Sequence, residues 1–189
     1  MFHHLKFYQK LILLSILYAF VFIMEIWLYD LSVKSTNHIV AILLTFLQCW
    51  NLILVGFLFF QTFKHVTFPK FVYKKLSFES PLYFRILGLN TYQFVLVNSF
   101  FRHLNQRVYL KGKSREYIKI YHAETKQSET SHWLSIFPTI LVQILFIMNG
   151  MYAYFLWLTI WSIIFNLYPI LLQRKNRFIL EKRFPTLLT

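Results

Sequence analysis

The chain has 189 residues, of which 57% are hydrophobic and 14% are charged, whereas soluble domains usually carry about a quarter charged residues. Its net charge of +13 comes from basic residues that lie between long apolar runs, which argues against a compact nucleic-acid-binding domain. The single cysteine, Cys49, excludes a disulfide framework and a CxxC metal site. We therefore expect an all-α integral membrane protein with one domain, residues 1–189.

The first two apolar runs cover residues 11–31 and 38–63, and each is long enough to cross a bilayer core of about 30 Å as a helix. No small-x-small cleavage site follows the first run, which predicts an uncleaved helix. Glu25 lies inside this helix. We interpret it either as a hydrogen-bond partner of an amide in the second helix, such as Gln48, or as a substrate contact.

The segment 64–130 mixes charged and aromatic residues, and we expect one or two amphipathic helices at the membrane surface here. One stretch, 91–104, is apolar enough to bury one face and ends at Arg102 and His103. Arg102 could bind a phosphate of a coenzyme or lipid, or it could lie on the solvated face of an interfacial helix. Residues 116–126 are polar and predicted to be helical.

Two further apolar runs, 131–149 and 151–172, are separated by an Asn149-Gly150 turn signal and followed by a basic tail, 173–189. In this arrangement, 19 of the 20 lysines and arginines lie on one side of the membrane, and Lys34 lies on the other. The positive-inside rule then predicts that both termini and the 64–130 loop face the cytoplasm.

Glu129 and His132 open the third run, and they share a helix face because they are three residues apart. A carboxylate beside an imidazole orients the ring and raises its basicity, as a general base for a hydroxyl nucleophile requires. The same residues also suit a helix N-terminus at a membrane interface. The pattern alone leaves both interpretations open.

A second polar group lies at the end of the fourth run. Asn166, Gln173 and Arg177 fall on nearly one line of a regular helix, which should face protein or a polar cavity rather than lipid. Pro169 frees a backbone carbonyl at about this level. The cation Arg174 could instead belong to a cytoplasmic anchor of snorkelling side chains.

The two polar groups should meet, because Asn149-Gly150 allows a tight helical hairpin. Counting back through that turn places His132 level with about residue 167 and Glu129 level with about residue 170. A base would then lie beside anion-binding donors at the cytoplasmic membrane surface, which suits acyl or phosphoryl transfer.

These motifs resemble those of the small bacterial membrane acyltransferases typified by glycosyl-4,4'-diaponeurosporenoate acyltransferase. The matching residues are Glu129-x-x-His132-Trp133, then Ser135 and Pro138, then Asn166-x-x-Pro169, and finally Gln173-Arg174-x-Asn176-Arg177. The resemblance implies an enzyme of the cytoplasmic (inner) membrane in carotenoid biosynthesis, which esterifies a fatty acyl chain onto the sugar of a glycosylated carotenoid.

The resemblance implies His132 and Glu129 as the catalytic pair. It implies a set of substrate contacts made up of Trp133, Asn166, Gln173, Arg174, Asn176 and Arg177. The expected partners are a membrane lipid or glycolipid-like acceptor and an acyl donor, either acyl-coenzyme A or an acyl-carrier protein, with no bound cofactor or metal.

Two other functions stay open at this point. One is a small lipid-modifying methyltransferase, although the chain's four glycines offer no convincing cofactor loop. The other is a non-enzymatic subunit of a membrane assembly, in which the polar stripe would contact a membrane-protein partner.

Overall fold

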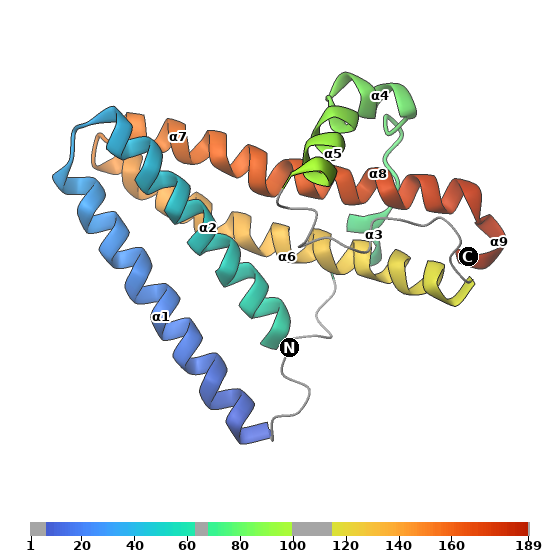
Figure 1. The fold of residues 1–189 in the computed structure, drawn as a ribbon, viewed down its shortest axis with the longest axis horizontal. Helices are drawn as coiled ribbons and strands as arrows, with labels where there is room; N and C mark the ends of the chain where they lie inside the picture. Colours follow the sequence, from blue (N-terminus) through green and yellow to red (C-terminus); the bar gives the residue numbers. More distant parts are fainter. Residues whose placement is uncertain (1–6, 63–67, 100–114, 189) are drawn as a thin grey trace. The chain divides into compact units, whose positions relative to one another are not determined.

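The computed structural model describes residues 7–62, 68–99 and 115–188, and all regular structure in these ranges is helical (Figure 1). The long helices are α1 (Phe7–Lys34), α2 (His38–Thr62), α6 (Arg115–Met148), α7 (Tyr152–Ser162) and α8 (Tyr168–Arg183). The short ones are α3 (Lys70–Tyr73), α4 (Pro81–Ile86), α5 (Leu89–Asn98), the π-helical segment η3 (Ile163–Leu167) and α9 (Pro185–Leu188).

Four helices are long and apolar enough to cross a membrane: those that cover Ile12–Lys34, His38–Phe60, Arg115–Met148 and Tyr152–Arg183. The expected all-α membrane architecture is confirmed. The last two helices are longer than expected, because α6 begins at Arg115 rather than residue 131 and α8 continues to Arg183. Neither Gly nor Pro lies between Arg115 and Phe137, so nothing in that polar stretch breaks the helix.

The chain divides into two compact units. The first unit comprises Met1–Val66 and Ser131–Leu167, and the second comprises Thr67–Thr130 and Tyr168–Thr189. The unit boundary within α6 therefore falls between Thr130 and Ser131.

In the first unit, α1 and α2 form a hairpin, and α2 also packs against α7 (Figure 1). Asn37 caps α2, because its side-chain oxygen accepts a hydrogen bond from the backbone N–H of Ile39 at 2.8 Å. Gly150 has a φ of +69°, which confirms the expected tight turn between α6 and α7. The apolar core includes Cys49, Phe146 and Leu158.

A polar contact lies inside this unit. Asn51 Nδ2 donates to Glu25 Oε2 at 2.9 Å and to the carbonyl of Val21 at 2.9 Å. Glu25 is therefore paired with a second-helix amide, Asn51, as one interpretation expected.

In the second unit, α4 starts at a cap in which Ser80 Oγ accepts from the Tyr83 N–H at 3.1 Å, with Pro81 as the first helical residue. Helix α5 follows Gly88 and packs against α8. Short helices in this segment were expected, and α4 and α5 confirm them. Arg102 and His103 lie outside the described residues.

Charged residues of the expected basic tail are buried within α8. Arg174, Lys175 and Arg177 have exposed fractions of only 9%, 8% and 3%. The alternative of snorkelling surface cations therefore does not hold for these residues. They are buried because acids and amides of the same unit accept their hydrogen bonds, as described below.

Candidate active site

His132 lies on α6 and is paired with Asn166 in the first unit. The ring nitrogen Nδ1 is 3.4 Å from Asn166 Oδ1. Asn166 is fully buried, whereas His132 keeps part of its surface exposed. The expectation that His132 lies level with about residue 167 is confirmed.

The orientation of the Asn166 amide determines which nitrogen of His132 carries the proton. Asn166 Nδ2 donates to Ser162 Oγ at 3.4 Å, so its Oδ1 is the atom that faces the ring. An amide oxygen only accepts hydrogen bonds, so Nδ1 must be the protonated nitrogen. Nε2 then carries a free lone pair, and this tautomer can remove a proton from a hydroxyl group.

Asn166 lies in η3, three residues before Pro169. Proline has no N–H to donate to the carbonyl four residues earlier, that of Phe165, and the backbone changes its hydrogen-bond register at this point. The polar stripe expected along this helix assumed uninterrupted α-helical geometry. The π-helical segment departs from that assumption.

Glu129 lies three residues before His132 on α6 but belongs to a cluster of charges in the second unit. It is fully buried. Its Oε2 accepts from Arg177 Nη2 at 2.5 Å, and its Oε1 accepts from Arg174 Nη1 at 3.1 Å. The orienting role expected of Glu129 toward the imidazole is filled in this structure by Asn166.

Arg174 connects this cluster to the segment before α4. Its Nε donates to Glu79, which is 5% exposed, and its other nitrogens donate to the carbonyls of Val72 at 2.8 Å and Lys74 at 3.0 Å. Two carboxylates thus balance two guanidinium groups, and Arg174 holds the 72–79 segment against α8. Sequence reasoning missed Glu79, since no local spacing relates it to Arg174.

Tyr73 adds a third contact to the same cluster. Its hydroxyl lies 2.5 Å from Thr130 Oγ1, and its ring lies 5.5 Å from the Arg177 guanidinium, within the range of a cation–π interaction. Tyr73 was also missed from the sequence. The sequence offered one indication of a functional role for Tyr73, namely its position among aromatic and basic residues.

The other predicted contacts of α8 are distributed around this cluster. Asn176 Nδ2 donates to the Tyr121 hydroxyl at 3.2 Å, and Gln173 is half-buried. Lys175, which was not predicted as a site residue, donates to Asn90 Oδ1 at 2.7 Å and to Gln93 Oε1 at 2.9 Å. Trp133 of the first unit is half-buried, and its Nε1 has no partner among the described residues.

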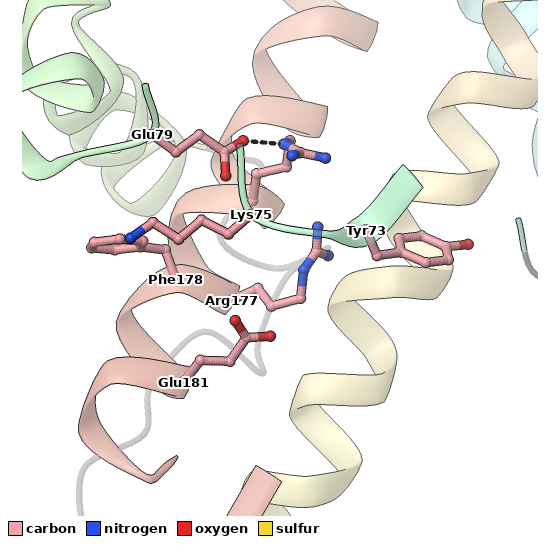
Figure 2. Close-up of a pocket in the computed structure, with 7 residues that line it drawn as sticks. Tyr73, Lys75, Glu79, Arg177, Phe178 and Glu181 are labelled. Carbon is pink, nitrogen blue, oxygen red and sulfur yellow. Dashed lines mark hydrogen bonds and ion pairs between the residues drawn. The ribbon is translucent and has the colours of Figure 1, made fainter. Parts of the chain in front are cut away.

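A small cavity of about 10 Å³, room for about one water molecule, opens beside the charge cluster (Figure 2). Figure 2 shows Arg177, Phe178 and Glu181 reaching it from α8, while Tyr73, Lys75 and Glu79 reach it from the preceding segment. Its lining residues are Tyr73, Lys75, Glu79, Arg174, Arg177, Phe178 and Glu181. Across the described ranges, no group of three or more His, Cys, Asp or Glu side chains could hold a metal ion.

A model of the glycosyl-4,4'-diaponeurosporenoate acyltransferase family matches residues 69–184, more than half of the chain. The match includes Glu79, the His132–Asn166 pair and all of α8. Helices α1 and α2 lie outside it. No curated protein and no solved structure matches the chain at a significant level.

Proposed function

The chain belongs to the glycosyl-4,4'-diaponeurosporenoate acyltransferase family, and on that premise we propose that it esterifies a fatty acyl group onto a hydroxyl of a lipid-soluble acceptor. The chain is a membrane acyltransferase, and four of its described helices are long and apolar enough to cross a membrane. Membership of this family favours acyl transfer over the other two functions considered from the sequence, a methyltransferase and a non-enzymatic subunit. The acceptor that the family name favours is a glycosylated carotenoid, whose sugar supplies the hydroxyl.

The observation that carries this proposal is the His132–Asn166 pair. With its proton on Nδ1, His132 takes the proton of the acceptor hydroxyl on Nε2. The hydroxyl oxygen attacks the thioester carbonyl carbon, the C–O bond forms and the C–S bond breaks. The leaving thiolate then takes the proton back from Nε2. The products are an ester and a free thiol, and the imidazole is regenerated.

The distribution of basic residues indicates the side of the membrane from which the acyl donor would arrive. Nineteen of the 20 basic residues fall on one side of the predicted topology, which supports cytoplasmic termini. Acyl-coenzyme A and acyl-carrier proteins are soluble cytoplasmic thioesters, so the acyl donor would reach the protein from this side. The charge cluster around Glu129 would form part of the donor-binding unit.

A His132→Ala variant tests the proposal. Loss of a general base lowers a rate by about 10²- to 10⁴-fold, so we expect acyl transfer in membranes to fall by that factor while the protein level is unchanged. The assay follows a labelled acyl group from thioester into lipid-soluble ester. The matched control is His38→Ala, because His38 is an exposed histidine at the start of α2. Normal ester formation by His132→Ala would rule out this mechanism.

A further inference from the structure

Arg177 keeps one guanidinium nitrogen without a partner in the described part of the chain. Its Nη2 donates to Glu129 at 2.5 Å, but its Nη1 is buried and has no acceptor there. The residue as a whole is only 3% exposed. A buried charged donor without a partner is costly, so Nη1 marks a position where an oxygen of a ligand would be bound.

Arg177 lines the cavity of Figure 2, and a wider hollow adjoins that cavity. The two share Tyr73 and Glu181 as lining residues. The hollow has a volume of about 460 Å³, and its lining residues are Phe71, Tyr73, Lys74, Lys126 and Glu181. All of them, like Arg177, belong to the second unit, so the hollow and the neighbouring cavity lie within one unit.

The hollow has an excess of positive charge. Lys74 and Lys126 bring two positive charges against the single carboxylate in its lining, Glu181, which also lies 3.0 Å from His122. Further in, the two arginines of the cluster are balanced by Glu79 and Glu129. The two lysines of the hollow are therefore the groups available to an anionic ligand, and the aromatic rings of Phe71 and Tyr73 lie beside them.

We propose that this hollow binds the phosphopantetheine arm of the acyl donor, which deepens and rests on the proposed function. Lys74 and Lys126 bind the phosphate. The arm passes Phe71 and Tyr73, and Arg177 Nη1 donates to one of its carbonyl oxygens. Acyl-coenzyme A and acyl-carrier proteins share this arm, so either source presents the same chemistry.

The test measures binding apart from catalysis. Coenzyme A is titrated into the full-length His132→Ala protein in detergent, and the same titration is repeated with Lys74→Gln and Lys126→Gln added together. Lys74 contacts Arg174 through its backbone carbonyl, so its side chain can be changed without removing that bond. We expect the two substitutions to weaken coenzyme A binding about tenfold.

Lys119→Gln is the matched control, because Lys119 is an exposed lysine on the same half of α6 and does not line the hollow. It should leave the dissociation constant unchanged. An unchanged constant in the double lysine variant would overturn the proposal, whatever the transfer assay shows. If acyl transfer is never detected but the lysine variants still lose coenzyme A, the proposed function fails and the binding site stands.

Competition identifies the part of the donor that is bound. We expect free 4'-phosphopantetheine to displace coenzyme A, and displacement by adenosine 3',5'-bisphosphate alone would overturn the assignment of the arm. Transfer assays with acyl-coenzyme A and with an acyl-carrier protein then distinguish the two sources. The KM of the true donor should rise in the double lysine variant while kcat is retained, and unchanged KM values for both donors would contradict the proposal.

Discussion

Glu129 is a fully buried carboxylate that balances Arg174 and Arg177. Removing one partner from a buried ion pair leaves the opposite charge uncompensated, which typically costs about 3–5 kcal/mol. The resemblance of the sequence to acyltransferases implied a catalytic role for this residue. Its contacts indicate that it also stabilises the second unit.

We expect Glu129→Gln to lower the free energy of unfolding by about 3 kcal/mol or more. Neutral Gln keeps the shape of Glu, but it leaves the buried cations Arg174 and Arg177 with Glu79 as the remaining carboxylate of the cluster. The measurement is the melting temperature of the purified protein in detergent. The control is Glu116→Gln in the exposed first turn of the same helix. Equal melting temperatures for Glu129→Gln and the wild type would contradict the stabilising role.

The sequence predicted that His132 lies level with about residue 167 and that the Glu129–His132 pair faces amides and guanidinium groups, but it did not predict Glu79 as a partner of Arg174. The first prediction follows from two regular helices joined by a tight turn, since counting residues back from the turn places these positions level. Arg174 and Glu79 are 95 residues apart. Periodicity carries no information about a contact of that kind, so the composition of the cluster had to come from the three-dimensional structure.

Among the elements of the first unit, α2 and α6 approach each other closely at Gly56. A Cβ atom built there would meet the side chain of Ser135 and would lie 2.5 Å from the backbone carbonyl oxygen of Ser131. Small residues allow such close approach between membrane helices. Ser131 directly precedes His132, so this approach also positions the turn of α6 that carries the proposed base.

We therefore expect Gly56→Ala to destabilise the protein by about 1–3 kcal/mol, because the backbone of α6 would have to move. Thermal unfolding in detergent measures the loss. Gly150→Ala is not a suitable control, since its φ of +69° adds backbone strain. Leu54→Ala, which changes an exposed position of the same helix, is suitable. An unaltered melting temperature for Gly56→Ala would show that the helices separate there without cost.

The sequence predicted the four long helices because apolar length is a local property. It predicted a polar helix at 116–126 and an apolar run from 131 as separate segments, whereas one continuous helix, α6, starts at Arg115 and includes both. The π-helical segment at Asn166 had one local signal, Pro169, which was interpreted only as a freed carbonyl. The change of register that accompanies it depends on how the surrounding backbone is hydrogen-bonded.

At the level of the whole molecule, the proposed groups belong to different units. The first unit includes His132, the proposed base, together with α1 and α2. The second holds the charge cluster and the basic hollow proposed for the donor. The family match begins at residue 69, so α1 and α2 add a helical hairpin to the part of the chain that carries the family's motifs.

Acyl transfer by the purified full-length chain in liposomes tests the proposed function most directly. The liposomes contain glycosyl-4,4'-diaponeurosporenoate as acceptor, and acyl-coenzyme A is added with a thiol reagent present. We expect one equivalent of free thiol for each equivalent of acylated acceptor, identified by mass spectrometry, and neither product from His132→Ala. Acylated acceptor at the same rate from His132→Ala, or thiol release without any ester, would contradict this expectation.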